Sequence, residues 1–268
     1  MPCGGYVILM SRVKDIRLKV IPSRVANDFV LKHHYSGRVV NTSKLHFGAF
    51  LDGVLHGVMS LGSSMMQRNM IPLVDGTKWS EAIELNRMVF DDVLPKYSES
   101  RCISVALKLL KKQAPHIKWV VSFADGTQCG DGTIYRASGF KLISVKKNNS
   151  LYRLTDGRVV NNLNMTGKYM LSDLRQRLDL SSSWSYNKNA KILGAKKVVG
   201  YQLKYIYFLH PEEQKNLTVP IIPFSKIKEM GASMYLGKNC DAGVIRSIPS
   251  VQDGGGGAVP TASLNNYA

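Results

Sequence analysis

The first 155 residues alternate between two hydrophobic patterns, one with the period of a strand and the other with the period of a helix. Apolar residues that alternate with polar ones, or form a short unbroken run, predict β-strands, whereas apolar residues three and four apart predict helices. We therefore predict strands at residues 17–21, 45–51, 54–61, 84–90, 119–123, 141–145 and 151–154, and helices at residues 23–34, 98–113 and 133–138. This alternation is typical of an α/β fold with a central sheet.

Local signals mark the ends of several predicted elements. Ser23 is a candidate N-cap for the first helix, and Gly139 suits the position just after the third. Asp52 and Gly53 separate two strand-like runs and predict a tight hairpin. The run at residues 119–123 is almost continuously apolar, which predicts a strand buried on both faces.

The second part of the chain has a different composition. Residues 156–200 are polar and basic, with one predicted helix at residues 171–178. Residues 201–209 have the pattern of a strand, so we expect the chain to return to the sheet there. Residues 253–268 include four consecutive glycines and no core-forming pattern, and we expect disorder.

Charge and cysteine usage narrow the class of protein. The formal net charge is +17, which favours a polyanionic partner such as DNA or RNA, although a basic surface kept for solubility gives the same sum. Four widely spaced cysteines indicate free thiols in a reducing compartment. No apolar run approaches the roughly 18 residues of a membrane span, so we expect a cytoplasmic protein without a membrane partner.

Two pairs of segments resemble the GNAT acetyltransferase superfamily. One is the run from Leu85 to Phe90 with the helix that begins at Ser98, and the other is the strand at 119–123 followed by a Tyr-x-x-x-Gly-Phe pattern that starts at Tyr135. The resemblance implies a mixed sheet flanked by helices and acetyl-CoA as donor. It assigns the cofactor to Val89, Ser98, Ser100 and Arg101, and it implies that Tyr135 protonates the leaving thiolate. The glycine-rich turn of the superfamily is absent, and residues 97–101 stand in its place.

Four further motifs resemble the phage Mom family more closely. They are the segments at residues 33–38, 84–87, 98–101 and 121–126, and the resemblance extends over about residues 20–155, more weakly to about 225. Mom proteins modify adenine in phage DNA and so protect it from host restriction enzymes. The resemblance implies an acetamido (carbamoylmethyl-type) group on adenine N6. It leaves open a glycyl-type donor such as glycyl-tRNA, and a bound iron ion.

Candidate catalytic side chains fall at the predicted edge of the sheet. His34 and Tyr35 follow the first helix, and Ser122 and Asp125 lie at the carboxyl end of the central strand, where open α/β sheets bind ligands. Three of the candidates have a structural alternative: a basic helix end for His34, a turn cap for Asp125, and a packing role for Tyr135. We predict that His34, Tyr35, Ser122 and Asp125 meet at a single cleft, with Tyr135 on the helix beside the cofactor.

Basic residues supply the expected contacts with double-stranded DNA. They are Arg38, Lys146, Lys147, Lys188, Lys191, Lys196 and Lys197, with Lys146 and Lys147 expected in a turn between two strands. We divide the chain into a GNAT-like catalytic core (residues 1–155), a basic extension (156–235) and a largely disordered tail (236–268). Two other functions stay open: acetyl transfer to a small amine or a protein, and DNA binding without catalysis. Self-association is also left open.

Overall fold

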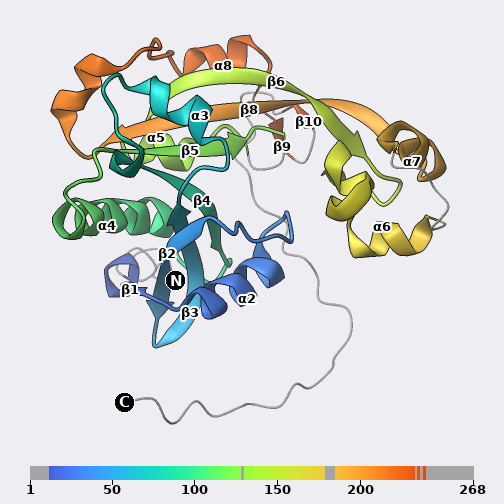
Figure 1. Cartoon of the computed structure of the whole chain (residues 1–268). Coiled ribbons are helices and arrows are strands. Elements are labelled where there is room, and N and C mark those ends of the chain that lie inside the picture. The colour runs from blue at the N-terminus through green and yellow to red at the C-terminus, as the bar shows by residue number, and fades with distance from the viewer. Residues whose placement is uncertain (1–11, 128–129, 179–184, 233, 236–237, 240–268) are drawn as a thin grey trace, which may run out of the picture.

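The core of the molecule is an eight-stranded mixed sheet with the strand order β1-β2-β3-β4-β5-β8-β6-β7 (Figure 1). The computed structural model describes residues 12–127, 130–178, 185–232, 234–235 and 238–239. The strands are β1 (Arg17–Val20), β2 (Ser43–Leu51), β3 (Val54–Gly62), β4 (Ala82–Phe90), β5 (Trp119–Asp125), β6 (Lys141–Arg153), β7 (Val159–Asn161) and β8 (Lys196–Phe208), with a separate pair β9 (Met234–Tyr235) and β10 (Lys238–Asn239). Only β4 and β5 of the large sheet run parallel, so the predicted mixed α/β sheet is confirmed.

Helices cover both faces of this sheet. They are α2 (Ser23–His33), α3 (Gln67–Met70), α4 (Ser98–Gln113), α5 (Thr133–Ala137), α6 (Ser172–Arg177), α7 (Tyr186–Ile192) and α8 (Ser225–Glu229). Short 3-10 turns are η1 (Arg12–Asp15), η2 (Ile71–Leu73), η3 (Trp79–Glu81), η4 (Asn162–Met165), η5 (Gly167–Tyr169) and η6 (Pro211–Asn216). Neighbouring residues of a strand point to opposite faces: Met59 packs in the cluster of α4, and Val58 packs in the cluster of α2. The two helices therefore lie on opposite sides of the sheet.

Several local predictions are confirmed by the backbone. The hairpin between β2 and β3 turns at Asp52 and Gly53, both with positive φ (51° and 81°), as a tight primed turn requires. Gly139 follows α5 with a φ of 85°. The prediction for Ser23 is wrong, because Pro22 is the N-cap of α2 and Ser23 is its first residue.

The expected turn at Lys146 and Lys147 does not exist. β6 is one 13-residue strand that pairs with β8 almost throughout, with bulges between Leu142 and Ser144 and between Asn148 and Leu151. Lys146 pairs with Gln202, and the adjacent Lys147 therefore points to the other face of the sheet. The local sequence is polar enough to suggest a turn, but the long-range pairing with β8 keeps it extended.

The strands β6 and β8 extend beyond the rest of the sheet and carry a second small core at their far end (Figure 1). We call residues 154–195 the outer unit. Its buried side chains include Met165, Leu174 and Leu193, and they pack against Tyr152 of β6. The outer unit is therefore a folded appendage of the sheet with an apolar core of its own.

Two expectations concern regions at the margin of the structure. Apart from Lys238 and Asn239, the predicted tail at residues 236–268 lies outside the described residues. Within the described ranges, no helix has both the length and the apolar character that a membrane crossing requires.

Gly200 lies where β8 passes from the core of the sheet to the outer unit, and the site has no room for a side chain. An added Cβ would lie 2.0 Å from Thr127 Oγ1 and 2.3 Å from Leu151 Cδ1. Thr127 Oγ1 accepts a hydrogen bond from the Tyr201 backbone N–H, so it cannot move away freely. We expect Gly200→Ala to lower the free energy of unfolding in urea by about 1–3 kcal/mol. Val199→Thr, at an exposed position of the same strand, is the control and should change it by less than about 0.5 kcal/mol. Equal stabilities for the two variants would contradict this packing.

Candidate active site

The central feature of the site is the point at which the two parallel strands separate. β4 and β5 pair only from Ala82 to Leu85 and from Trp119 to Ser122. Beyond these residues β4 stays paired with β3, and β5 stays paired with β8. A cavity of about 1320 Å³ opens where the two strands part, beside residues 84–88 of β4 and the carboxyl end of β5.

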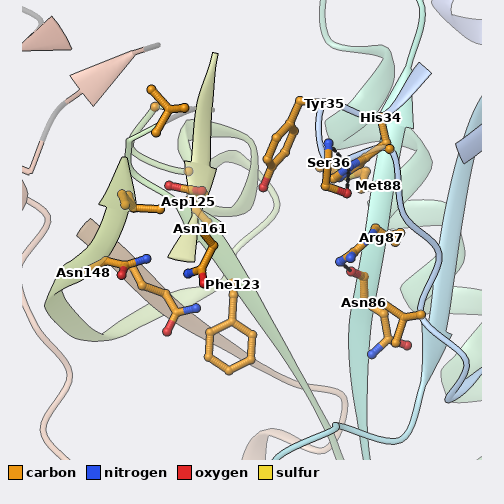
Figure 2. Close-up of a pocket in the computed structure, with 18 of the residues that line it drawn as sticks. His34, Tyr35, Ser36, Asn86, Arg87, Met88, Phe123, Asp125, Asn148 and Asn161 are labelled. Atoms are coloured by element: carbon orange, nitrogen blue, oxygen red, sulfur yellow. Dashed lines mark hydrogen bonds between the residues drawn. The ribbon is translucent and has the colours of Figure 1, made fainter. Parts of the chain in front are cut away.

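Side chains from six parts of the chain line this cavity (Figure 2). They include His34 and Tyr35 after α2, Asn86, Arg87 and Met88 of β4, Phe123 and Asp125 of β5, Tyr135 of α5, Asn148 of β6, and Asn161, Asn164 and Asp173 of the outer unit. The sheet thus supplies the floor and one wall, and the outer unit supplies the facing wall. Four of the five predicted catalytic side chains line the cavity.

His34 is held as a neutral ring at the exit of α2. Its Nδ1 accepts a hydrogen bond from the Ser36 backbone N–H (3.1 Å) and lies 2.8 Å from Ser36 Oγ. Burial, and secondarily the positive charge of Arg87, lowers the pKa of His34 to about 4. Because Nδ1 is an acceptor, the ring proton resides on Nε2. His34 therefore offers a hydrogen-bond donor to the cavity at neutral pH, and it stacks on Tyr35 with 4.3 Å between ring centroids.

Tyr35 and Asp125 approach the cavity from opposite sides. The Tyr35 side chain is 57% exposed and extends into the cavity towards the wall that carries Asp125 (Figure 2). Asp125 Oδ1 accepts a hydrogen bond from the Thr127 backbone N–H (3.0 Å). Asp125 therefore caps the turn and also lines the cavity, because the cap fixes its carboxylate at the end of β5.

Two arginines connect the α2 exit with its surroundings. Arg87 Nε donates to the Arg38 carbonyl (2.9 Å), and its Nη1 donates to the Asn86 carbonyl (2.8 Å). Burial lowers the pKa of Arg87. The Arg38 guanidinium donates to the Tyr169 carbonyl in the outer unit. Arg38, a predicted DNA contact, therefore bridges the core and the outer unit.

Ser122 lies apart from the predicted cluster. Its side chain is fully buried (0% exposed), and its Oγ donates to the Leu85 carbonyl across the parallel pair (3.2 Å). Ser122 and Asp125 are three positions apart on one strand, so their side chains point to opposite faces. Tyr135 comes from that opposite side, packs against Phe140 and Tyr205, and still reaches the cavity lining.

The predicted cofactor residues do not line the cavity. Val89 is buried in the apolar cluster beneath α2. Ser98 Oγ donates to the Pro95 carbonyl, and Ser100 Oγ donates to the Tyr97 carbonyl, so both hydroxyls serve the start of α4. Arg101 is exposed on α4. The hydroxyls of Ser98 and Ser100 are thus engaged in holding the helix start.

Among the described residues, no group of three or more His, Cys, Asp or Glu side chains is arranged to hold a metal ion. Cys102 is buried in the core, and burial raises the pKa of its thiol to about 12, which makes the thiolate a minor species.

The predicted DNA-binding lysines are exposed but spread over several surfaces. Lys188 and Lys191 lie one turn apart on α7, and Lys196 and Lys197 follow at the start of β8. Lys146 shares a sheet face with Lys204, which lies 5.6 Å over the Phe123 ring and whose pKa is lowered by burial and then by Lys146. The positive charge therefore extends from the cavity side of the sheet to the outer unit.

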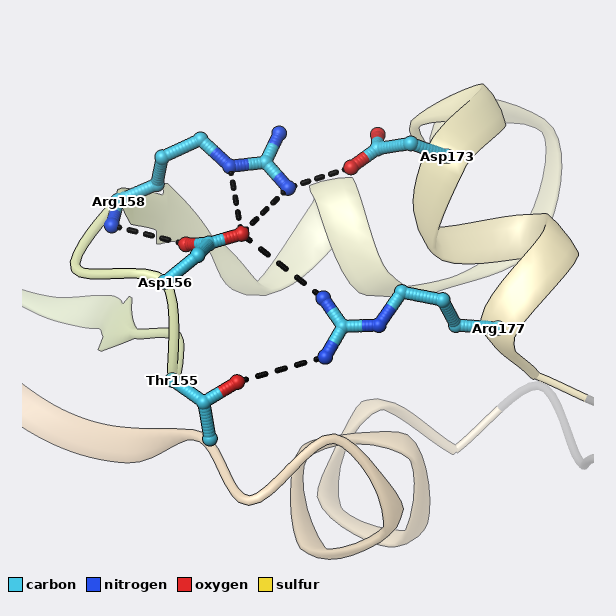
Figure 3. Close-up of polar contacts among 5 residues, drawn as sticks. All are labelled: Thr155, Asp156, Arg158, Asp173 and Arg177. Carbon is cyan, nitrogen blue, oxygen red and sulfur yellow. Dashed lines mark hydrogen bonds and ion pairs between the residues drawn. The ribbon is translucent and has the colours of Figure 1, made fainter.

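An ion-pair network holds the wall that faces the sheet (Figure 3). Arg158 donates through Nε and Nη2 to Asp156 (2.9 and 2.8 Å), and it also pairs with Asp173 of α6. Arg177 lies 3.8 Å from Asp156 and donates to Thr155 Oγ1 (3.4 Å). Hydrogen bonds from Arg158 lower the pKa of both Asp156 and Asp173. The network fixes the loop before β7 against α6.

Sequence patterns do not identify the carboxamides of the cavity. Asn161 and Asn164 belong to the polar segment at residues 156–200, and Asn148 directly follows the turn expected at Lys146 and Lys147. Their one local signal is the spacing of Asn161 and Asn164, which form a reciprocal cap at the start of η4. Nothing in that spacing indicates that the cap faces a cavity of the sheet.

The fold and the cavity define an α/β protein with a polar site at the divergence of two parallel strands. The chain belongs to the Mom protein family, which it matches over residues 15–226.

One curated relative and several solved structures are similar to this chain. Over 131 residues the chain is 40% identical to the methylcarbamoylase Mom of Escherichia phage Mu, an alignment covering 48% of this chain and 54% of that protein. The chain thus spans about half the length of this relative. A Bacillus subtilis acetyltransferase in complex with CoA has a TM-score of 0.39 at 10% identity, covering 72% of this chain and 98% of that one. The ribosomal-protein-S18-alanine N-acetyltransferase of Escherichia coli has a TM-score of 0.40 at 8% identity, covering 72% and 94%.

The lowered pKa of His34 predicts a component of acid sensitivity. The unfolded imidazole takes up a proton as the pH falls through about 6.5, but the folded one does so only near 4. The folded state binds fewer protons in this window, so stability falls as the pH is lowered from 6.5 to 4, by at most about 3 kcal/mol. His34→Asn keeps an acceptor for the Ser36 N–H and removes the titration.

Urea unfolding between pH 7 and 4 measures this effect. We expect the decline in stability to be shallower for His34→Asn than for the wild type, and His33→Asn, at the exposed neighbouring position, is the matched control. Parallel curves for wild type and His34→Asn would show that His34 is not held neutral by its surroundings.

Proposed function

We propose that this protein is a transferase that places an acyl-derived group of the carbamoylmethyl type on N6 of adenine in double-stranded DNA. The observation that carries the proposal is the cavity between β4 and β5, which combines an exposed aromatic ring (Tyr35) with a fixed carboxylate (Asp125). Membership of the Mom family and similarity to a methylcarbamoylase support the same reaction class. Protection of phage DNA from host restriction, in the host cytoplasm, follows as the biological role.

The separated strands suit the donor. Past Leu85 and Ser122, the facing edges of β4 and β5 no longer pair with each other. The backbone N–H and C=O groups on such edges require hydrogen-bond partners, and the amides of an extended ligand provide them. Acyl-CoA has an extended arm that carries amides and supplies an activated carbon when bound. Acetyl-CoA is our first candidate, but it lacks the nitrogen of a carbamoylmethyl group, so a reaction with it also requires a nitrogen donor and a two-electron oxidant. A glycyl-type donor is the second candidate and balances without them, because glycine already carries that nitrogen and an oxidised methylene, and the alcohol of its ester leaves.

The acceptor must leave the DNA duplex to reach the cavity. Enzymes that act on a base generally extrude it, at a cost of a few kcal/mol, and stack it on an aromatic side chain. Tyr35 provides the ring, and Asp125 is placed to accept a proton from the adenine amine. That amine is a weak nucleophile, so an acceptor for its proton is needed. Neutral His34 contributes an Nε2 donor, not a second base.

The basic surface is proposed to hold the phosphates. The lysines of α7 and the start of β8 extend from the outer unit, whose residues 157–173 contribute to the cavity wall. We retain the proposed division into a catalytic core at residues 1–155 and a basic extension at 156–235. In this division β8 belongs to the extension and yet lies between β5 and β6 in the sheet.

The chemistry is tested by analysis of DNA from cells that express the protein. Nucleosides from a digested plasmid should contain a heavier deoxyadenosine by mass spectrometry. Asp125→Asn keeps an oxygen to cap the Thr127 N–H but removes the carboxylate charge, and we expect it to lower the adduct at least 100-fold. Asp92→Asn, at an exposed position, is the matched control, and Ser122→Ala should retain the adduct because Ser122 is buried away from the cavity. Unmodified nucleosides from folded wild-type protein would refute the proposal.

The DNA-binding surface is tested by the salt dependence of affinity. Each lysine that neutralises a phosphate contributes about 0.9 to the slope of log affinity against log salt concentration. The double variant Lys188→Ala/Lys191→Ala should therefore reduce the absolute value of this slope by about 2. Lys111→Ala/Lys112→Ala removes the same charge from the end of α4, at the other end of the molecule (Figure 1), and should leave the slope unchanged. Equal effects of the two pairs would show that only total charge matters.

A further inference from the structure

Carboxamide side chains occupy both walls of the cavity. Asn148 of β6, Asn161 at the end of β7 and Asn164 of η4 line the side of the outer unit, and Asn86 of β4 lines the opposite side. Figure 2 shows Asn148 and Asn161 on the same side as Asp125, facing the strand that carries Asn86. A carboxamide carries both a donor and an acceptor, so its role depends on which of the two is already engaged.

On the outer wall, the local backbone engages the oxygens. Asn148 Oδ1 accepts from the Ser150 N–H (3.0 Å), and Asn161 Oδ1 accepts from the Leu163 N–H (3.0 Å). Asn164 Oδ1 accepts from the Asn161 N–H (3.2 Å). A backbone N–H can only donate, so these contacts fix which end of each amide is the oxygen. The remaining group of each side chain is an NH2 donor.

Asn86 shows the same polarity on the other wall. Its Oδ1 accepts from Ser43 Oγ (3.0 Å), and the residue is only 7% exposed. Its Nδ2 is buried and has no hydrogen-bond partner within the described part of the chain. An unpaired buried donor is unfavourable, so this NH2 calls for an acceptor that the described residues do not supply.

We propose that Asn86, Asn148, Asn161 and Asn164 form the subsite that recognises the ring nitrogens of an extruded adenine and so sets the base specificity. This inference rests on the proposed function. Adenine presents ring nitrogens as acceptors and a single amine as donor. Several NH2 donors complement the ring nitrogens, and the Asp125 carboxylate complements the amine. Guanine carries an N–H where adenine has the acceptor N1, so it meets these donors with the wrong polarity.

Asp125 and two of the carboxamides, Asn148 and Asn161, lie on the same side of the cavity (Figure 2). Asp125 pairs with Gln202, and Gln202 pairs on its other side with Lys146, so the three side chains form a row across β5, β8 and β6. Asn148 lies two positions beyond Lys146 on the same face. Neighbouring strands lie about 5 Å apart, so Asp125 and Lys146, on strands separated by β8, are about 10 Å apart at the backbone. A base whose amine meets Asp125 therefore extends from β5 towards the carboxamides, whose side chains span the remaining distance.

A single substitution reverses the polarity of this subsite. Asn161→Asp keeps the oxygen that caps the Leu163 N–H and replaces the NH2 donor with an acceptor oxygen. Asn162→Asp adds the same charge at the adjacent residue, which is not part of the cavity lining. The pair therefore separates the loss of the donor from the addition of negative charge near DNA.

Binding to DNA duplexes that carry one unpaired base measures the base specificity in the absence of a group donor such as acetyl-CoA. The full-length protein is titrated, at one salt concentration, with otherwise identical duplexes that carry an adenine bulge or a guanine bulge, and fluorescence anisotropy is recorded. We expect the wild type and Asn162→Asp to prefer the adenine bulge about tenfold, and Asn161→Asp to lose or invert this preference. The proposal is overturned if the wild type shows no preference, if Asn161→Asp retains it, or if Asn162→Asp loses it equally.

The failure of this inference is distinguishable from failure of the transfer reaction. If the wild type forms no adduct in cells but shows the adenine preference that Asn161→Asp abolishes, recognition stands and transfer fails. If wild type and Asn161→Asp form the deoxyadenosine adduct equally, transfer stands and this subsite is refuted.

Discussion

The separation of β4 and β5 after four paired residues is the constraint on which the rest of the site depends. An exposed strand edge in a protein interior is unfavourable unless other interactions hold both strands in place. Here β3 holds β4 and β8 holds β5 over the full length of the gap. β8 is therefore a structural requirement of the cavity. β8 begins after residue 195, so the cavity needs chain segments from both before and after the outer unit.

Local patterns in the sequence predict most of the elements but not their long-range partners. The predicted bounds of the helix at residues 98–113 agree with α4, and the Asp52-Gly53 hairpin is where the sequence places it. The prediction fails at residues 146–150, where a polar run has the composition of a turn. Pairing with β8 keeps that run extended, and the periodicity of a single sequence contains no information on a pairing partner more than 50 residues away.

The difference between local patterns and long-range partners also explains which site residues the sequence predicts. His34, Tyr35 and Asp125 end elements that converge on the sheet edge, so their positions follow from topology. The strand period alone would have separated Ser122 from Asp125, because residues three apart on a strand face opposite sides. The carboxamides are different: Asn161 is ordinary turn chemistry by its sequence, and only the folded sheet brings it opposite Asn86.

The outer unit gives the cavity its second wall, and its attachment determines how firmly that wall is held. Two extended strands carry it, the Arg158 network fixes its first loop, and Arg38 connects it to the α2 exit. Arg38 also provides the carbonyl that orients Arg87. One residue thus links the outer wall with the side chains around His34. A base that contacts both walls would couple them in the same way, so recognition by the carboxamides and alignment of the amine with Asp125 would depend on one another.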